Sequence, residues 1–552
     1  MNIFQHLLVA PAALGLLAPL AVDASKPASA AELNARPLNI RGVSDYASSS
    51  SPNSRSSNSL EQVTSITQFS DVYPTDWAYQ ALSNLIERYG CVAGYPNGTY
   101  RGQRAMTRFE AAALLNACLD RVTEVTDELK RLIKEFEKEL AILKGRVDGL
   151  EANVGELEAT QFSTTTKLSG QTTFVVGANS FGGNAKGILD EANATRANKD
   201  YGATSFNYDQ QLVFNTSFTG KDNLIAVLRA GNFDGGTNAF GGGGPSPLSQ
   251  LEVAFQEGDT PNFVVIDKLF YTFPLGDTIV LTAGGSVGQE DMLGIWPSVY
   301  PSSTVLDVLT LNGAPAAYNK NLGAGAGITW TTNGFSVTAN YVAANGNSSN
   351  PNEGGIATNG SGGTGTVQIG YQSDTWGLAA LYSSIQNGND IIVYGTTFAL
   401  ESFTNKGTTS AFALSGYWQP EESGWVPSIS AGWGINSTSY NGSVYNDPSV
   451  DASRLVTTSQ SWSVGLNWTD VFIRGNNAGM AVGQPVFATA LESGDTPRDG
   501  NYVWEWWYQF QVTDNISITP ALFYLSRPYG QDTPTGDTFN QFGGLVKTQF
   551  LF

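Results

Sequence analysis

Charged side chains are scarce in this chain: Asp, Glu, Lys and Arg make up 14% of its 552 residues, against about 25% in ordinary soluble domains. Long apolar runs are missing too, since no stretch after residue 30 offers the roughly 18 consecutive apolar residues that a spanning helix requires. A closed β-barrel remains as a membrane structure, because it satisfies its backbone hydrogen bonds between strands and hides apolar residues at every second position.

Histidine is almost absent, and the single one, His6, lies in the N-terminal apolar stretch. Residues 1–30 read as a signal peptide, with an apolar run from Leu7 to Val22 and small residues at Ala28-Ser29-Ala30, although no Lys or Arg precedes the run. Cleavage of this segment on export would leave a mature chain without histidine. Such a chain cannot carry a Ser-His catalytic site, a histidine general base or a histidine-bound metal. We therefore predict no enzyme, no cofactor and no metal site.

Cysteine is equally rare, and the two residues, Cys91 and Cys118, fall in one short segment. In an exported protein such a pair can oxidise to a disulfide, but the sequence does not give its separation in space. A disulfide and two buried free thiols therefore both remain open. A metal site made of two cysteines without histidine is not expected.

The remaining sequence divides into four parts. We expect a flexible linker over 31–67, which is rich in Ser and Asn, and a compact helical domain over 68–121. Residues 122–160 are expected to form one coiled-coil helix, and a barrel is expected over 165–552. The apolar residues of the helix recur at alternating steps of three and four with a single stutter, which favours self-association; they are Val122, Val125, Leu129, Leu132, Phe136, Leu140, Leu143, Val147, Leu150, Val154 and Leu157.

The C-terminal part contains repeated segments of alternating apolar and polar residues, as membrane-spanning strands require. Trp504, Trp506 and Tyr508 share one face of such a segment, and Asn333-Gly334 is a tight hairpin turn. Short and long connections alternate between the segments, which predicts sixteen strands with both ends on one side; fourteen or eighteen remain alternatives. The predicted strands are 165–177, 207–219, 223–232, 263–273, 278–288, 321–331, 335–344, 365–372, 376–384, 410–418, 425–435, 459–468, 477–484, 502–512, 516–526 and 542–552.

The last segment is itself amphipathic, with Phe550 and Phe552 on one face and Lys547 and Gln549 on the other. A terminal Phe that closes such a strand resembles the signal read by outer-membrane assembly machinery. A barrel of sixteen strands is too wide for its own side chains to fill, so it is expected to hold water. This predicts a channel that small solutes cross by diffusion.

Charge in the barrel region is unbalanced, because residues 165–552 contain 14 Lys and Arg but 30 Asp and Glu. An acidic lumen would attract cations, whereas carboxylates on outer loops would have little effect. The third long loop, 289–320, is the longest. In trimeric porins this loop commonly folds into the lumen, and a resemblance to them implies the same here. The candidate lining or constriction residues are Arg229, Lys268, Glu290, Asp291, Asp307, Arg474, Glu505 and Lys547.

The segment 68–121 carries a specific set of motifs: Phe69-Ser70-Asp71-Val72, Trp77-Ala78, Leu85, Gly94-Tyr95-Pro96-Asn97-Gly98-Thr99-Tyr100 and Thr107-Arg108-Phe109-Glu110. With these motifs it resembles a surface-layer-homology (SLH) domain. The resemblance implies binding to cell-wall polysaccharide linked to peptidoglycan. The residues carried over for that role are Trp77, Gly94, Tyr95, Thr107, Arg108 and Glu110; Arg108 could instead form an ordinary ion pair.

The order of one wall-binding domain, a coiled coil and a barrel resembles the cyanobacterial outer-membrane porins, which group with the carbohydrate-selective porin family and are often labelled iron-uptake porins. The resemblance implies a homotrimeric channel for small ions, including iron, and for small sugars. It places the barrel in outer-membrane lipid and the N-terminal domain in the periplasm, with no nucleic-acid partner. The alternative is a structural tether between membrane and cell wall whose barrel conducts little.

Overall fold

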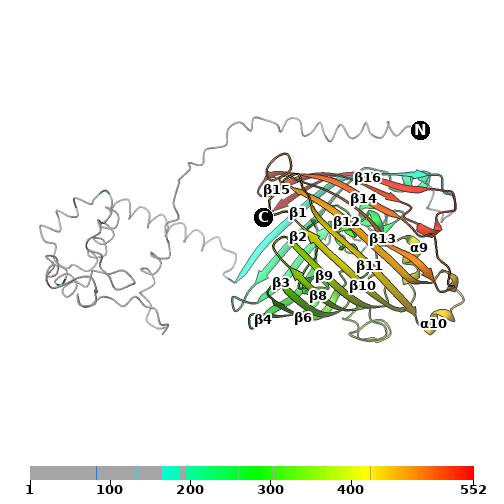
Figure 1. Ribbon diagram of the computed structural model, residues 1–552, viewed down its shortest axis with the longest axis horizontal. Helices are drawn as coiled ribbons and strands as arrows, with labels where there is room; N and C mark the ends of the chain where they lie inside the picture. Colours follow the sequence, from blue (N-terminus) through cyan, green and yellow to red (C-terminus); the bar gives the residue numbers. More distant parts are fainter. Residues whose placement is uncertain are drawn as a thin grey trace. The chain divides into compact units, whose positions relative to one another are not determined.

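A computed structural model of the chain describes residues 165–186, 194–258, 260–301, 305–422 and 424–552, together with Ser83, Lys134 and Lys138. The chain divides into two compact units, residues 1–160 and 161–552. Sixteen antiparallel strands of the second unit close into a barrel, in which each strand pairs with its neighbours in sequence and β1 pairs with β16 (Figure 1). The predicted fold class and strand number are confirmed.

The strands are β1 (Thr166–Gly183), β2 (Ser205–Thr216), β3 (Asn223–Gly231), β4 (Val265–Leu275), β5 (Ile279–Gly288), β6 (Leu322–Thr332), β7 (Phe335–Ala343), β8 (Gly363–Gln372), β9 (Trp376–Gln386), β10 (Gly407–Trp418), β11 (Ser428–Tyr440), β12 (Val456–Thr469), β13 (Asn477–Leu491), β14 (Tyr502–Thr513), β15 (Ile516–Ser526) and β16 (Phe539–Leu551). Several continue further towards the long loops than predicted, because the apolar alternation that marks a strand stops where its outer face leaves lipid. Strand β13, for example, runs on to Leu491.

Seven short turns connect the strands at one end and eight longer loops at the other, as predicted. In the turn between β6 and β7, Asn333 and Gly334 have φ of 46° and 83°, which is the left-handed pair that a two-residue hairpin requires. The long loops carry the short helices α7 (Ala194–Tyr201), α8 (Asp307–Thr310), α9 (Thr397–Phe403) and α10 (Gly442–Tyr445). In Figure 1, α9 and α10 lie at the end of the barrel opposite the C-terminus.

The outer wall of the barrel is apolar and is bordered by aromatic rings. Leu378, Leu414, Ile369 and Val337 are among its exposed apolar side chains. Near the short turns, neighbouring rings touch in series: Phe335 with Tyr371 and Tyr371 with Trp376, and elsewhere Trp425 with Phe472 and Phe472 with Tyr508. An apolar band with an aromatic girdle is the surface that a barrel presents to a bilayer.

The predictions for the N-terminal part fall almost wholly outside the described residues. This applies to the SLH residues, to Cys91 and Cys118, to the linker and to the signal peptide. Within the predicted coiled coil, Lys134 and Lys138 are helical and exposed. No described helix is long and apolar enough to cross a membrane.

Candidate functional site: the barrel lumen

The third long loop, L3 (residues 289–321), lies inside the barrel. Backbone groups of its described residues bond to side chains that point inward from six strands, so the loop crosses a large part of the lumen. The partners are Thr338 of β7, Gln368 of β8, Ser383 of β9, Ser415 of β10, Ser430 of β11 and Glu505 of β14. The expected insertion of this loop is therefore observed.

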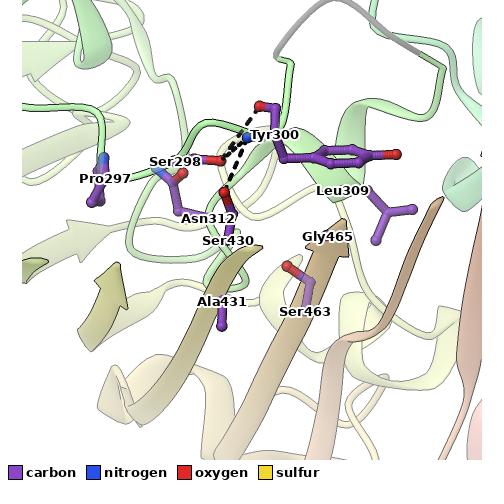
Figure 2. Close-up of a pocket in the computed structure, with 9 residues that line it drawn as sticks. All are labelled: Pro297, Ser298, Tyr300, Leu309, Asn312, Ser430, Ala431, Ser463 and Gly465. Carbon is purple, nitrogen blue, oxygen red and sulfur yellow. Dashed lines mark hydrogen bonds between the residues drawn. The ribbon is translucent and has the colours of Figure 1, made fainter. Parts of the chain in front are cut away.

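Glycines in the wall let L3 lie directly on the strands. A Cβ added at Gly432 would stand 1.8 Å from the carbonyl oxygen of Asn312, and one at Gly465 would stand 2.6 Å from the ring of Tyr300. Figure 2 shows residues around the small cavity left between the loop and β11 and β12; the ring of Tyr300 points away from Ser430 there. The backbone N–H of Tyr300 donates to Ser430 Oγ at 3.0 Å. Larger side chains at these wall positions would lift the loop away.

The second long loop, L2 (residues 232–264), also enters the barrel. Its Phe240, Leu248 and Leu251 are buried in one apolar cluster with Phe523 of β15 and Leu545 of β16. The same cluster includes residues of L3, such as Leu306 and Leu309. L2 and L3 therefore both occupy the lumen and share a core, so the open passage is narrower than the barrel.

Lys268 of β4 holds the start of L3. Its Nζ lies 2.7 Å from Glu290 Oε1 and 2.7 Å from Asp291 Oδ2. Asp291 also accepts the backbone N–H of Gly288 at 2.8 Å, where the loop leaves β5. About one fifth of each of the three charged side chains remains exposed. This cluster therefore anchors the loop and presents both signs of charge to the lumen.

A second group of charges lies on β2 to β4. Arg229 Nε donates to Asp209 Oδ1 at 2.8 Å, and a guanidinium nitrogen lies 3.7 Å from Asp267. The guanidinium also lies over the ring of Phe255 in L2, with Cζ 4.6 Å from the centroid. Arg229 thus joins the wall to L2, and stacking and ion pairing together hold it in one orientation.

A third group lies at the other end of L3, where Lys320 Nζ donates to Asp307 Oδ1 at 3.0 Å. Burial alone would lower the pKa of Lys320, but the negative charges of Asp307 and Glu252 outweigh it and raise that pKa. Tyr394 of the loop after β9 donates its hydroxyl to the other oxygen of Asp307 at 2.6 Å. Burial raises the pKa of Glu252 in L2, which also feels the charges of Lys320, Arg229 and Lys547.

Glu505 is a buried anchor for the middle of L3. One carboxylate oxygen accepts the hydroxyl of Tyr300, and the other accepts the backbone N–H of Leu306 at 2.9 Å. Trp507, two residues further along β14, donates its indole N–H to the Tyr300 hydroxyl at 2.8 Å. Lys547 of β16 is 5% exposed and lies within the electrostatic reach of Glu505 and Glu252.

Of the eight residues proposed from the sequence, seven lie in or beside the lumen and one does not. Arg474 belongs to the exposed turn 470–476 between β12 and β13, so it is not a wall residue and is no longer proposed for the constriction. The structure adds Asp209, Glu252, Lys320 and Tyr394. Lys320 is the last residue of the predicted loop 289–320 and could have been included, whereas Glu252 enters only through the folding of L2.

Towards the short turns, the inward face of β1 to β4 carries mainly amides and hydroxyls. Gln171 and Gln211 pair across β1 and β2 on the same face as Arg229, and Asn223 pairs with Thr272 of β4. Asn223 donates to Asn215 Oδ1 at 2.9 Å. Such groups exchange hydrogen bonds with water or with solute hydroxyls without attracting either sign of charge.

The loops around the mouth are tied together by buried hydrogen bonds and by more exposed ion pairs. Asp499 accepts the hydroxyl of Thr396 at 2.6 Å and the backbone N–H of Gln531 at 2.8 Å. Burial raises the pKa of Asp499 to about 7. Arg454 bridges Glu401 at 2.6 Å and Asp532 at 3.0 Å. The loops that follow β9, β11, β13 and β15 therefore form one connected rim.

Comparison with known proteins agrees with this architecture. The model of the carbohydrate-selective porin, OprB family, matches residues 124–552, and the S-layer homology domain model matches residues 68–112. The chain belongs to the carbohydrate-selective porin family. It is thus a porin-type channel of the outer membrane with an SLH domain on the periplasmic side, as predicted.

Two cyanobacterial proteins are similar to this porin over nearly their whole length. An uncharacterized protein of Nostoc sp. is 35% identical over 90% of this chain and 86% of its own. An uncharacterized protein of Synechocystis sp. is 32% identical over 90% of this chain and 92% of its own. The structure of Pseudomonas putida OprB, at 12% identity, covers 72% of this chain and 96% of its own with a TM-score of 0.44.

A different group of proteins is similar to a short part of this chain. Outer membrane protein SlpA of Deinococcus radiodurans is 38% identical over 105 residues, which is 17% of this chain and 9% of that protein.

Proposed function

We propose that this porin forms a narrow, water-filled diffusion path for small polar solutes, comprising inorganic ions, including iron, and small sugars. The supporting observation is that L3 crosses the lumen while the charges of the Lys268 and Lys320 groups stay partly exposed beside it. These cations each have an acidic partner, so the described passage offers mixed charge rather than one sign. Together with the amide side chains of β1 to β3 nearer the short turns, this lining suits neutral, hydroxyl-rich solutes as well as ions.

Charge selectivity is expected to be mildly cationic. Many of the acidic side chains of the barrel region lie in exposed loops and turns rather than in the lumen; examples are Asp200, Asp277, Glu353, Asp374, Asp390, Glu421, Glu422, Asp447, Asp451, Asp470, Glu492, Asp495 and Asp514. Exposed charges more than about 10 Å from the path are screened at 0.1 M salt. The lumen itself retains a small excess of carboxylates, which favours cations.

We test this function with the full-length protein in planar bilayers and in proteoliposomes. We expect discrete conductance steps, a reversal potential in a KCl gradient that favours K⁺ weakly, and swelling of liposomes in iso-osmotic glucose. Anion preference would contradict the acidic lumen. Bilayers without any steps would favour the alternative, a tether whose barrel is sealed by the shared core of L2 and L3.

The N-terminal domain is proposed to bind cell-wall polysaccharide linked to peptidoglycan, and the coiled coil to join three chains. The residues proposed for wall binding are Trp77, Gly94, Tyr95, Thr107, Arg108 and Glu110. A fixed guanidinium pairs well with an acidic sugar group. The single SLH copy in each chain supports a trimer, because three chains would supply three copies.

Arg108→Ala is expected to weaken binding to purified cell wall about tenfold or more, since one hydrogen bond to a charged group contributes roughly 1.5–3 kcal/mol. Cosedimentation with wall fragments over a range of protein concentrations measures the change. Arg104→Ala removes the same charge within the SLH domain but outside the Thr107–Glu110 motif, and should leave binding nearly unchanged. Equal binding by both variants would remove Arg108 from the wall site.

A further inference from the structure

The carboxylates of the lumen differ in whether another group already holds them. Most of them form ion pairs or hydrogen bonds to L3; they are Asp209, Asp267, Glu290, Asp291, Asp307 and Glu505. Within the part of the chain that the structure describes, the carboxylate of Glu252 in L2 has neither an ion pair nor a hydrogen bond. Its negative charge is therefore not offset by a direct contact.

The side chain of Glu252 is directed away from the apolar core of L2. Its neighbours Leu251 and Val253 are each 2% exposed and belong to the cluster that L2 shares with L3. Glu252, between them, is partly exposed. Because successive side chains of an extended segment point to opposite sides, the carboxylate lies on the side of L2 that faces away from this core.

Three cations from separate parts of the lumen lie within electrostatic reach of Glu252. They are Lys320 at the end of L3, Arg229 on β3 and Lys547 on β16. Lys320 and Arg229 each form ion pairs with other carboxylates. A residue that feels β3, β16 and the end of L3 together lies inside the barrel, so its exposed carboxylate faces the passage.

The backbone at Glu252 is fixed to L3. Leu251 and Leu306 form a short antiparallel bridge between the two loops. The N–H of Glu252 donates to the carbonyl oxygen of Val305 at 2.9 Å. A carboxylate on such a support loses little conformational entropy when an ion approaches it.

An unpaired carboxylate attracts a passing cation more strongly than a paired one does. Where Lys268 Nζ lies 2.7 Å from Asp291 Oδ2, the opposite charges partly cancel for an ion in the passage. Glu252 shares the field of its three cations with the carboxylates that those cations already contact. At the narrow level where L2 and L3 meet, it therefore presents the least neutralised negative charge.

We propose that Glu252 determines the cation preference of the passage, because its carboxylate briefly holds a permeating monovalent or divalent cation. The proposal rests on the proposed function, since it needs a conducting path. Carboxylate oxygens are ligands that hard cations accept in exchange for water. One carboxylate alone holds such an ion weakly, so the ion leaves again, as conduction requires.

The test is the permeability ratio of K⁺ to Cl⁻ in the full-length protein, from reversal potentials in a KCl gradient. Mildly alkaline buffer favours the ionised form, since burial raises the pKa of Glu252. Glu252→Gln should lower the ratio about fivefold, the factor for one charge ~4 Å from an ion at the dielectric constant of water. Glu252→Asp keeps the charge and should retain most of the ratio. Glu353→Gln makes the same change of charge in the exposed loop after β7 and should leave the ratio unchanged.

A second measurement distinguishes contact with the ion from an effect on the fold. Addition of MgCl₂ should lower the K⁺ preference of the wild type, because Mg²⁺ competes for the carboxylate. Glu252→Gln should respond less, since it has no such carboxylate at this position.

The outcomes separate the two proposals. A wild-type channel without conductance steps would refute the proposed function. A conducting wild type whose permeability ratio is unchanged in Glu252→Gln would overturn the role of Glu252 alone. An equal fall in Glu252→Asp or in Glu353→Gln would overturn it as well, because the charge at this position would then not be the cause. Equal responses of the wild type and Glu252→Gln to MgCl₂ would overturn the contact with the cation.

Discussion

Glu505→Ala is expected to release the middle of L3 and to raise the single-channel conductance. The carboxylate holds Tyr300 and the backbone N–H of Leu306 against β14, and it is fully buried. Each hydrogen bond to a charged group contributes about 1.5–3 kcal/mol. Losing two of them shifts the equilibrium constant between L3 bound to β14 and L3 detached from it by roughly 100-fold or more. Larger and noisier openings in planar bilayers would report the release.

Glu505→Gln is the matched control for this variant. The amide keeps one acceptor oxygen and replaces the other with a donor, so one of the two hydrogen bonds to L3 survives. Its conductance should fall between those of the wild type and Glu505→Ala. If the alanine variant folded, as judged by its resistance to heat in detergent, and conducted like the wild type, Glu505 would not be the anchor of L3.

Lys268→Met is expected to make the channel clearly more selective for cations. Removing this ammonium group leaves Glu290 and Asp291 without their partner, while both are still partly exposed to the lumen. An unpaired charge about 4 Å from a passing ion is worth ~1 kcal/mol even at the dielectric constant of water. The permeability ratio of K⁺ to Cl⁻, from reversal potentials, should therefore rise about fivefold.

Lys221→Met makes the same change of charge in an exposed short turn and should hardly alter the ratio. The effect of Lys268→Met should also shrink as KCl is raised from 0.1 to 1 M, where the Debye length falls to about 3 Å. A similar shift in both variants would mean that net charge, rather than the pairing at L3, sets the selectivity.

The barrel could be predicted from the sequence because its signal is local and repeated. Alternation in segments such as Trp504–Val512 depends on which side of the wall meets lipid, and each short turn carries its own chemistry, as Asn333-Gly334 does. The strand ends were less well predicted. Beyond the predicted ends, β1 continues over 178–183 and β13 over 485–491, where apolar and polar residues no longer alternate, so the pattern does not mark the strand.

The interior of the lumen could be predicted only in part. Length and position drew attention to 289–320, and strand position placed Lys268 and Glu505 on the inner face. The pairing of Lys320 with Asp307 and Tyr394 depends on how L3 and the loop after β9 fold inside the barrel. Glycines such as Gly432 and Gly465 look like weak strand residues in the sequence, and their purpose appears only when L3 lies on them.

The attachment of L3 to β14 has a consequence for biogenesis. Tyr300 and Glu505 are 205 positions apart, so this attachment forms only in a sheet that already contains both β5, which L3 follows, and β14. A partly assembled barrel, still an open curved sheet, would therefore carry an unsecured L3. The narrow passage is therefore completed only when both of these distant parts of the sheet are in place.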